Sequence, residues 1–172
     1  MFGFWKKQPE EETPKAERAD ELWEQGSKLL ERRRIGPAIE AMREAMQIEP
    51  SRLEGRLNLG AALYLAGQHE EALTHLKYVL AFDAKNSMAL LNLAACYDAL
   101  GQLDDSIVML EQLVAERPNW KDANYNLAVA YFKQKEYDKS ADALRAELKL
   151  NPQNEAARAL LNKIHLMPNR KK

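Results

Sequence analysis

Small and large apolar residues recur along this chain at a fixed spacing, which we call the repeat interval. Two columns hold small side chains, namely Gly26, Gly60, Ala94 and Ala128, and Ala38, Ala72, Ser106 and Ser140. Two further columns hold large side chains, namely Leu29, Leu63, Tyr97 and Tyr131, and Met42, Leu76, Leu110 and Leu144. A constant period of about 34 residues is typical of proteins built from stacked repeats. The interval therefore predicts the fold more directly than any single residue does.

Each repeat unit divides into two helical patterns separated by a short polar break. The break is Gly67-Gln68 in the second unit and Gly101-Gln102 in the third. The ends of the units keep the same interval, at Pro50, Ala84, Pro118 and Pro152. Small residues at fixed places in both helices let the two backbones approach closely, while the large residues fill the space between neighbouring pairs. The pattern thus predicts stacked helix–turn–helix units.

The fourth unit, residues 121–154, resembles the tetratricopeptide repeat (TPR) family. It carries the family's N-L-x-x-A-Y core from Asn126 to Tyr131, the aromatic Tyr137 after the turn, and a closing Asn-Pro. The resemblance implies an all-α fold: a right-handed α-solenoid of four stacked TPR helix pairs with a C-terminal capping helix.

The other three units match the same pattern to different degrees. Residues 53–86 and 87–120 match nearly as well as the fourth unit, through NLGAALYLAGQHEEAL and NLAACYDALGQLDDSI. Residues 19–52 form a degenerate first repeat, because Arg33-Arg34 stands where the second and third units have Gly-Gln. Four copies in phase cover about four-fifths of the chain.

The two ends of the chain depart from the repeat. Residues 155–167 are expected to form the capping helix, because Ala157, Leu160, Leu161 and Ile164 follow the spacing of one helix face. A basic tail follows at residues 168–172. Residues 1–18 are expected to form a flexible N-terminal segment, aromatic at its start and then rich in Lys, Glu and Pro.

Residues 1–7 read MFGFWKK and permit three interpretations. They form a disordered start, or they make peripheral membrane contact, with aromatic rings at the lipid boundary and lysines near anionic head groups. In the third interpretation the aromatic side chains enter the protein's own groove or a partner.

Composition excludes several classes of protein. No apolar run is long enough to span a bilayer. The single cysteine, Cys96, rules out an intramolecular disulfide framework and is interpreted as a small buried hydrophobe. The net charge is −1, and no broad basic face with interleaved aromatic residues indicates nucleic-acid binding. We therefore expect a cytoplasmic protein, membrane-associated if residues 1–7 contact lipid.

No pattern of catalytic residues is present. His69 and His75 lie six positions apart, a spacing that does not place them on one helix face as metal ligands. The sequence contains no glycine-rich phosphate loop, zinc-ligand spacing or nucleophile elbow. Acidic pairs such as Glu70-Glu71 and Asp104-Asp105 open helices, where carboxylates favour the positive end of the helix dipole. We expect neither enzymatic activity nor a cofactor or metal.

The resemblance implies a concave groove lined by the first helix of each pair. Carried over to this sequence, the groove would use one group of apolar, aromatic and amide side chains: Trp23, Leu57, Asn58, Tyr64, Leu91, Asn92, Tyr125, Asn126, Val129 and Phe132. Asn58, Asn92 and Asn126 stand one repeat interval apart, and an amide can both donate and accept hydrogen bonds. The three amides either hold the backbone of a bound peptide or tie adjacent helices together.

The same comparison argues against one known mode of binding. Some family members grip a C-terminal carboxylate of heat-shock chaperones through lysines and an arginine in the groove. The matching places here hold no cation: Trp23, Ser27, Asn58, Met88 and Asn92. A carboxylate without cationic partners would not recover its desolvation cost in a partly buried groove.

The function that follows is a non-enzymatic scaffold or adaptor, which binds a peptide or helical segment of a protein partner in the concave groove. The alternative is a small TPR chaperone or assembly factor, which shields an apolar segment of a secreted or membrane-complex client. Self-association into a homo-oligomer is a further expectation, because an apolar edge of the first unit would pair with a second copy.

Overall fold

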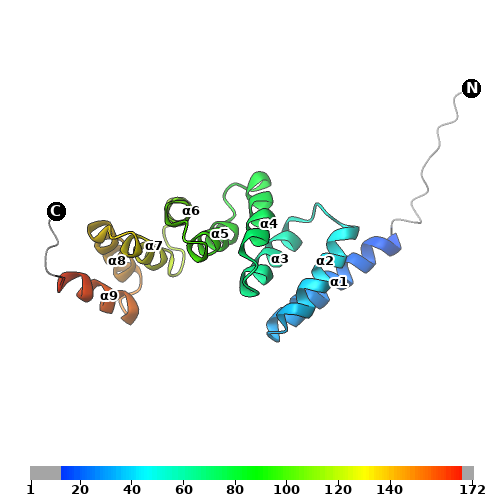
Figure 1. The fold of residues 1–172 in the computed structure, drawn as a ribbon, viewed down its shortest axis with the longest axis horizontal. Coiled ribbons are helices and arrows are strands. Elements are labelled where there is room, and N and C mark those ends of the chain that lie inside the picture. Colours follow the sequence, from blue (N-terminus) through cyan, green and yellow to red (C-terminus); the bar gives the residue numbers. More distant parts are fainter. Residues whose placement is uncertain (1–12, 168–172) are drawn as a thin grey trace, which may run out of the picture. The chain divides into compact units, whose positions relative to one another are not determined.

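The computed structural model describes residues 13–167 of the chain, and within them every regular element is a helix (Figure 1). The helices are α1 (Thr13–Glu31), α2 (Ile35–Ile48), α3 (Leu53–Leu65), α4 (His69–Phe82), α5 (Ser87–Ala99), α6 (Leu103–Glu116), α7 (Ala123–Lys133), α8 (Tyr137–Leu150) and α9 (Glu155–His165). Four helix pairs and a ninth helix in this part of the chain confirm the all-α expectation. The interpretations of residues 1–7 and the basic tail from residue 168 lie outside the described residues.

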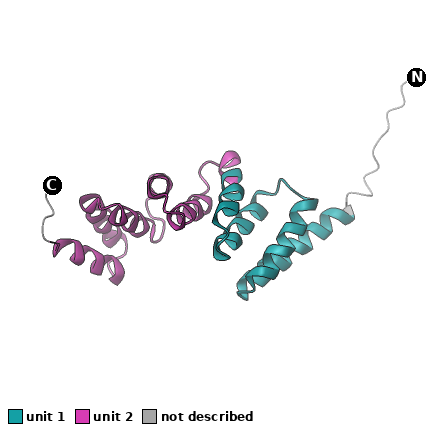
Figure 2. Ribbon diagram, in the orientation of Figure 1, with its two compact units in different colours: residues 1–78 teal, residues 79–172 magenta. Residues whose placement is uncertain are grey.

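The chain divides into two compact units, Met1–Tyr78 and Val79–Lys172 (Figure 2). The division falls inside α4, so unit 1 contains α1, α2, α3 and most of α4. Unit 2 contains the end of α4 and the five helices that follow. Each unit is described separately below.

Helix α1 begins earlier than the sequence pattern indicated. Residues 13–18, expected to belong to the flexible N-terminal segment, form its first turns. Proline fits the first turn of a helix, so Pro14 does not oppose this start. Arg18 also reaches α2, where its Nη2 donates to Glu44 Oε1 at 3.3 Å. Residues 14–18 are all exposed, so these first turns have no buried column that would mark them in the sequence.

Glycine allows close packing within both helix pairs of unit 1. A Cβ on Gly26 would lie 2.6 Å from Met42 Cγ, and one on Gly60 would lie 2.7 Å from Leu76 Cγ. Both distances are far shorter than van der Waals contact, so the large residue of α2 or α4 occupies the space that a side chain would need. The small and large columns of the sequence thus interlock in these pairs.

In unit 2 the column of small residues that contains Ser106 and Ser140 also supplies hydrogen bonds between paired helices. Ser106 Oγ of α6 donates to the carbonyl oxygen of Ala94 in α5 at 2.9 Å. Ser140 Oγ of α8 makes the same bond to Ala128 of α7 at 2.7 Å. Both serines are buried, so the bonds satisfy hydroxyl groups that would otherwise be costly to desolvate.

The last helix closes the core of unit 2. Ala157 and Ile164 of α9 are fully buried and belong to the same hydrophobic cluster as Leu110 and Leu144. Asn154 caps the helix, because its Oδ1 accepts from the backbone N–H of Ala157 at 3.0 Å. Helix α9 therefore buries one face on the preceding pair, as expected of a capping helix.

Helix α7 begins two residues later than the repeat register indicates. Asn86 caps α5 through its side chain, but the equivalent residue before α7 is Trp120, which has no acceptor oxygen. Asp122 instead adopts a left-handed backbone with φ 61° just before the helix. The unit that best fits the family pattern in sequence consequently has a first helix of 11 residues, against 13 in α3 and α5.

The turn inside every pair contains a residue with positive φ, again at the repeat interval. The φ angles are 57° at Arg33, 77° at Gly67, 75° at Gly101 and 66° at Lys135. Glycine adopts this left-handed conformation without steric cost, whereas a residue with a Cβ loses roughly 1–2 kcal/mol. The first and fourth turns therefore carry backbone strain that the middle two avoid.

We expect Lys135→Gly to stabilise unit 2 by up to about 1 kcal/mol, because relief of strain exceeds the added entropy of the unfolded chain. The reciprocal change Gly101→Lys should destabilise the same unit by about 1 kcal/mol. Urea denaturation of the two variants measures both effects. Equal, negligible shifts in the two midpoints would contradict the assignment of strain to this position.

His75 is buried in unit 1 beside charged neighbours on three helices. Its Nδ1 lies 3.5 Å from Arg56 Nη1, and its Nε2 lies 3.9 Å from Glu71 Oε1. Burial, assisted by the positive charges of Arg56 and Arg43 and opposed by Glu71, lowers the pKa of His75 below its ordinary value of 6.5. The folded protein therefore holds this imidazole neutral.

The lowered pKa of His75 predicts a loss of stability in weak acid. As the pH falls below 6.5, the unfolded chain takes up the proton first, so the free energy of unfolding decreases until the folded pKa is reached. The melting temperature of the protein should fall between pH 7.5 and roughly 5.5, and His75→Gln should reduce that fall. His165→Gln is the control, because that side chain is exposed. An unchanged pH dependence in His75→Gln would show that other groups cause it.

Candidate functional site

The predicted groove residues of unit 1 lie on α1 and α3, and their exposure differs. Leu57, Asn58 and Tyr64 of α3 are half-buried, as expected of residues that line a binding face. Trp23 of α1 is 5% exposed and so contributes mainly to packing. The ring of Tyr64 also contacts His69 at the start of α4, with 5.4 Å between ring centroids.

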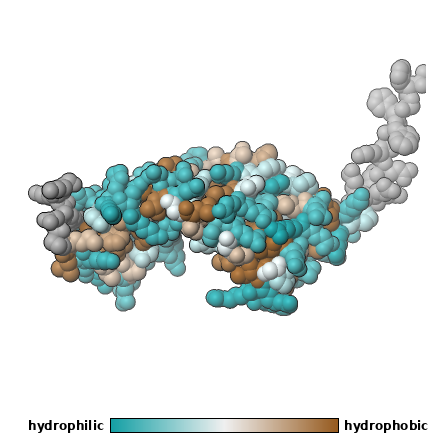
Figure 3. All heavy atoms as spheres, viewed as in Figure 1, coloured by the Kyte–Doolittle hydropathy of each residue, from teal (hydrophilic) through white to brown (hydrophobic). Residues whose placement is uncertain are grey.

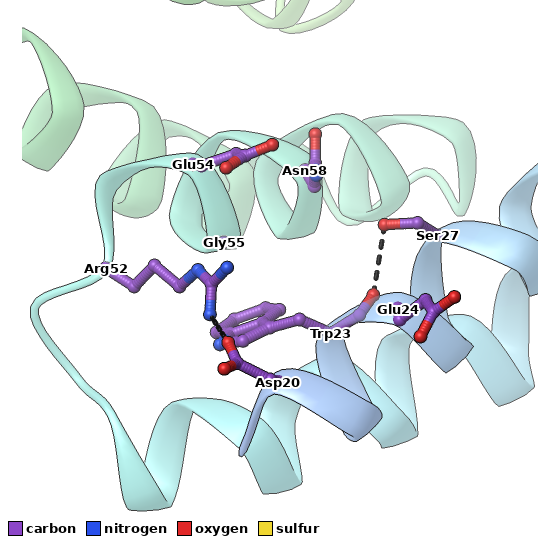
Figure 4. A pocket seen from close by; sticks show the side chains of 8 residues that line it. All are labelled: Asp20, Trp23, Glu24, Ser27, Arg52, Glu54, Gly55 and Asn58. Atoms are coloured by element: carbon purple, nitrogen blue, oxygen red, sulfur yellow. Dashed lines mark hydrogen bonds and ion pairs between the residues drawn. The ribbon is translucent and has the colours of Figure 1, made fainter. Parts of the chain in front are cut away.

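Trp23 and Asn58 meet at a pocket of about 350 Å³ between α1, the α2–α3 loop and α3 (Figure 4). Eight residues line it: Asp20, Trp23, Glu24, Ser27, Arg52, Glu54, Gly55 and Asn58. Figure 4 shows the indole ring of Trp23 below Gly55, with Asn58 on the facing helix. The structure thus brings together two of the predicted residues and adds others that the sequence pattern did not indicate.

Gly55 sets the position of the Trp23 ring. A Cβ on Gly55 would lie 2.4 Å from Trp23 Cζ2, so any larger residue would displace the indole. Trp23, Leu57, Leu91 and Tyr125 share one repeat position, and Gly55, Ala89, Ala123 and Ala157 share another. The largest member of the first column, Trp23, contacts the smallest member of the second, Gly55. This paired change in size is the sequence signal that could have revealed their contact.

Charges around the unit 1 pocket are predominantly negative. Arg52 forms an ion pair with Asp20, and its Nη1 also lies 3.3 Å from Glu49 Oε2, so its charge is compensated. The hydrogen bond to Asp20 raises the pKa of Arg52. Glu24 binds Lys28 at 2.6 Å, whereas Glu54 has no ion-pair partner among the described residues. The pocket therefore offers no uncompensated cation for an acidic group.

The predicted residues of unit 2 lie on α5 and α7. Leu91, Tyr125 and Phe132 are partly buried and pack against the hydrophobic core of the unit. Asn92, Asn126 and Val129 are half-buried on the same two helices. An ion pair joins these helices, because Lys133 Nζ lies 2.5 Å from Asp98 Oδ2.

Phe132 is covered by the helices that follow it. Its ring meets Tyr137 of α8 edge to face, with 5.4 Å between centroids. Lys163 of α9 places its Nζ 5.0 Å from the centre of the Phe132 ring, within the range of a cation–π contact. The capping helix thus contributes to the surroundings of a predicted groove residue, a role that the repeat pattern did not reveal.

The three repeated asparagines have unused hydrogen-bonding capacity. In the part of the chain that the structure describes, no hydrogen bond joins the side-chain amide of Asn58, Asn92 or Asn126 to another residue. Each of these residues is half-buried, so it reaches the surface. The hydroxyl groups of Ser106 and Ser140 differ from these amides, because both donate hydrogen bonds inside their helix pairs.

Within residues 13–167, no group of three or more His, Cys, Asp or Glu side chains could hold a metal ion. Burial raises the pKa of the Cys96 thiol to about 11, so it stays protonated at neutral pH. In the same residues, no helix is both long and apolar enough to cross a bilayer. On the face drawn in Figure 3, the surface is largely hydrophilic and contains patches of hydrophobic residues.

Family profiles match most of the chain. Two profiles described as tetratricopeptide repeat match it, one over residues 63–122 and 105–164 and the other over residues 23–87. The chain belongs to the tetratricopeptide repeat family. Repeats of this family serve generally as protein-interaction modules, so the TPR chain is an interaction scaffold in that general sense.

Curated relatives match the TPR chain over part of its length. Hsp70-Hsp90 organizing protein 1 of Glycine max is 26% identical over 126 residues, which is 72% of this chain and 22% of that protein. Protein O-mannosyl-transferase TMTC1 of Homo sapiens is 30% identical over 96 residues, covering 56% of this chain and 11% of that protein. This chain thus spans about a fifth or less of the curated relatives it matches.

Solved structures share the fold of the TPR chain. MamA from Desulfovibrio magneticus RS-1 aligns with a TM-score of 0.80 at 23% identity, over 86% of this chain and 84% of that one. YrrB, whose structure is described as a TPR protein with an unusual peptide-binding site, aligns with a TM-score of 0.76 at 19% identity, over 82% and 73% of the two chains. These likenesses establish an all-α TPR solenoid as the fold class.

We expect Gly55→Ala to destabilise unit 1 by about 1–3 kcal/mol, because the indole of Trp23 must move. The double variant Trp23→Leu with Gly55→Ala should recover most of the loss, since it restores the pair that later repeats carry. Chemical denaturation measures both. Gly36→Ala is the matched control, because no atom lies within 4 Å of the added Cβ. A loss that persists in the double variant would refute this steric pairing.

Proposed function

We propose that the protein is a non-enzymatic adaptor that binds a peptide or helical segment of a partner protein on the faces formed by α1 and α3 and by α5 and α7. The observation that carries this proposal is the set of three half-buried amides, Asn58, Asn92 and Asn126, which lack internal partners among the described residues. An amide held in that state would donate to and accept from a peptide backbone. The internal-bonding alternative has no hydrogen bond to support it within residues 13–167.

The neighbours of the amides would select the side chains of the partner. Leu91, Tyr125, Val129 and Phe132 offer apolar contact in unit 2, and Leu57 and Tyr64 offer it in unit 1. Recognition that combines backbone hydrogen bonds with apolar anchors is a recurrent way of holding a short segment. An uncharged or amphipathic segment would fit this arrangement best.

The carboxylate-gripping mode of some family members is not part of the proposal for this chain. The matching places hold no lysine or arginine: Trp23, Ser27, Asn58, Met88 and Asn92. Trp23 is itself buried, so this position presents little side-chain surface to a ligand. We therefore assign no C-terminal carboxylate to the partner.

A chaperone or assembly factor that shields an apolar client segment is the second candidate. It is favoured by the apolar character of the unit 2 face, where four of the six predicted residues are hydrophobic or aromatic. Retention of a folded partner at equilibrium would support the adaptor, whereas suppression of client aggregation would support the chaperone. In both proposals the protein acts in the cytoplasm, with membrane contact through residues 1–7 and homo-oligomer formation as further parts of the proposal.

The double variant Asn92→Ala with Asn126→Ala should lose partners that the wild-type protein captures from its native lysate. Its free energy of unfolding should change by less than about 1 kcal/mol, because no internal hydrogen bond is removed. Asn162→Ala on the exposed surface of α9 is the control for loss of an amide elsewhere. Quantitative mass spectrometry of the three captured samples, with thermal unfolding of each protein, provides the measurement.

Two outcomes would contradict the proposed site. A collapse of the melting temperature in the double variant would show that the amides hold the helices together. Identical captured proteins from all three samples would place binding on another surface. The triple variant of Tyr64, Tyr125 and Phe132 to Ala tests the apolar contacts in the same way, and should lose the same partners.

A further inference from the structure

Unit 2 contains a second pocket, of about 540 Å³, where the end of α6 and the α6–α7 loop face α7 and α8. We name it the seam pocket. Nine residues line it: Val114, Pro118, Asn119, Asn124, Asp142, Arg145, Ala146, Lys149 and Leu150. No residue of the predicted groove is among them, so the seam pocket is separate from the face proposed above.

A buried amide faces the seam pocket. Asn124 is 5% exposed, and no hydrogen bond joins its side chain to another described residue. The same repeat position holds Leu22 in the first repeat, Arg56 in the second and Leu90 in the third, and both leucines are buried. The amide of Asn124 still reaches solvent, because neither its nitrogen nor its oxygen is a fully buried atom without a partner. At the pocket it can therefore exchange water for hydrogen bonds to a ligand.

The equivalent seam one repeat earlier is closed by two polar contacts. Gln112 Nε2 of α6 donates to the carbonyl oxygen of Ala84 at 2.8 Å. Lys85 Nζ lies 2.9 Å from Glu116 Oε2. Both contacts join the loop after α4 to α6, and all four residues belong to unit 2.

The residues that close the earlier seam are all changed at the seam pocket. One repeat interval onward, Gln112 becomes Ala146, Glu116 becomes Leu150 and Lys85 becomes Asn119. None of these residues can reproduce the earlier bonds, and all three line the pocket. The seam is therefore opened by specific substitutions at positions that close it elsewhere in the same unit.

The lining of the seam pocket combines apolar surface with one uncompensated cation. Val114, Pro118 and Leu150 supply the apolar part. Arg145 is paired with Asp142 at 2.5 Å, whereas Lys149 has no ion-pair partner among the described residues. The helix dipole accounts for a cation in the last turn of α8, but not for its position beside an open pocket and an unpartnered amide.

We propose that the seam pocket binds a peptide segment of a partner protein that carries an apolar side chain next to a carboxylate. The apolar side chain contacts Val114 and Leu150, and the carboxylate pairs with Lys149. The Asn124 amide bonds the peptide backbone with its donor and acceptor atoms. This site would let the scaffold hold a second segment independently of the face formed by α5 and α7.

The decisive variant is Asn124→Leu, which restores the residue of the first and third repeats. The probe is a fluorescently labelled, capped hexapeptide of alternating leucine and glutamate, and binding to the full chain is measured by fluorescence anisotropy. We expect Asn124→Leu to weaken binding at least about tenfold, while its melting temperature rises by about 2–4 °C. Weaker binding together with a higher melting temperature would show that the variant has lost the site and kept the fold.

A second set of variants tests the pocket without changing the core. Ala146→Gln supplies the side chain that closes the earlier seam and should also abolish binding. Lys149→Gln should weaken binding and its salt dependence, whereas Lys15→Gln, with the same charge change on α1, should leave both unchanged. The hexapeptide with glutamine in place of glutamate should bind more weakly to the wild-type protein.

The proposal is overturned if the hexapeptide fails to bind the wild-type chain below about 1 mM. It is equally overturned if Asn124→Leu and Ala146→Gln bind as the wild type does, or if Lys15→Gln matches the loss in Lys149→Gln. Retained binding by the Asn92 and Asn126 alanine variant would confirm that the seam pocket is distinct from the groove face. Loss of binding in that variant would instead assign the peptide to the groove and refute the seam site.

Discussion

Close backbone contact between the two helices of each pair is the constraint on which the rest of the structure depends. In unit 1 it requires glycine at positions 26 and 60, because Met42 and Leu76 fill the space that a Cβ would need. In unit 2 alanine suffices there, and Ser106 and Ser140 bridge the helices through hydrogen bonds to backbone carbonyls. Whichever device is used, one face of each helix is committed to its partner, and another face of the first helix is the one that we propose for binding.

Much of this could be predicted from the sequence, because the contacts within a pair repeat at a constant interval. The helix pairs and the capping helix followed from the columns of small and large residues, without knowledge of any partner. The start of α1 could not be predicted in the same way, since residues 14–18 are exposed and belong to no column of small or large residues. The late start of α7 was also hidden, because the left-handed backbone at Asp122 that precedes it is not marked in any column of the repeat.

The candidate sites were predictable only in part, for a related physical reason. A column of identical residues such as Asn58, Asn92 and Asn126 can be read directly from the sequence, but whether those amides have internal partners depends on side-chain geometry. The packing of Trp23 on Gly55 needed the spatial pairing of two positions in different repeats, which no single column contains. Periodicity identifies what the repeats share, whereas specific binding depends on what one repeat changes.

Both pockets illustrate how a repeat protein gains a distinct surface without changing its fold. Where the repeat is regular, a small residue of one helix faces a large residue of its partner, and the hydroxyl groups of Ser106 and Ser140 bond backbone carbonyls. A departure at one position leaves either excess volume or a polar group without an internal partner. Trp23 with Gly55 is compensated in volume, although the buried indole Nε1 has no hydrogen-bond partner among the described residues. Asn124 has no internal partner either, but its amide reaches solvent beside an open pocket, where a ligand would meet it.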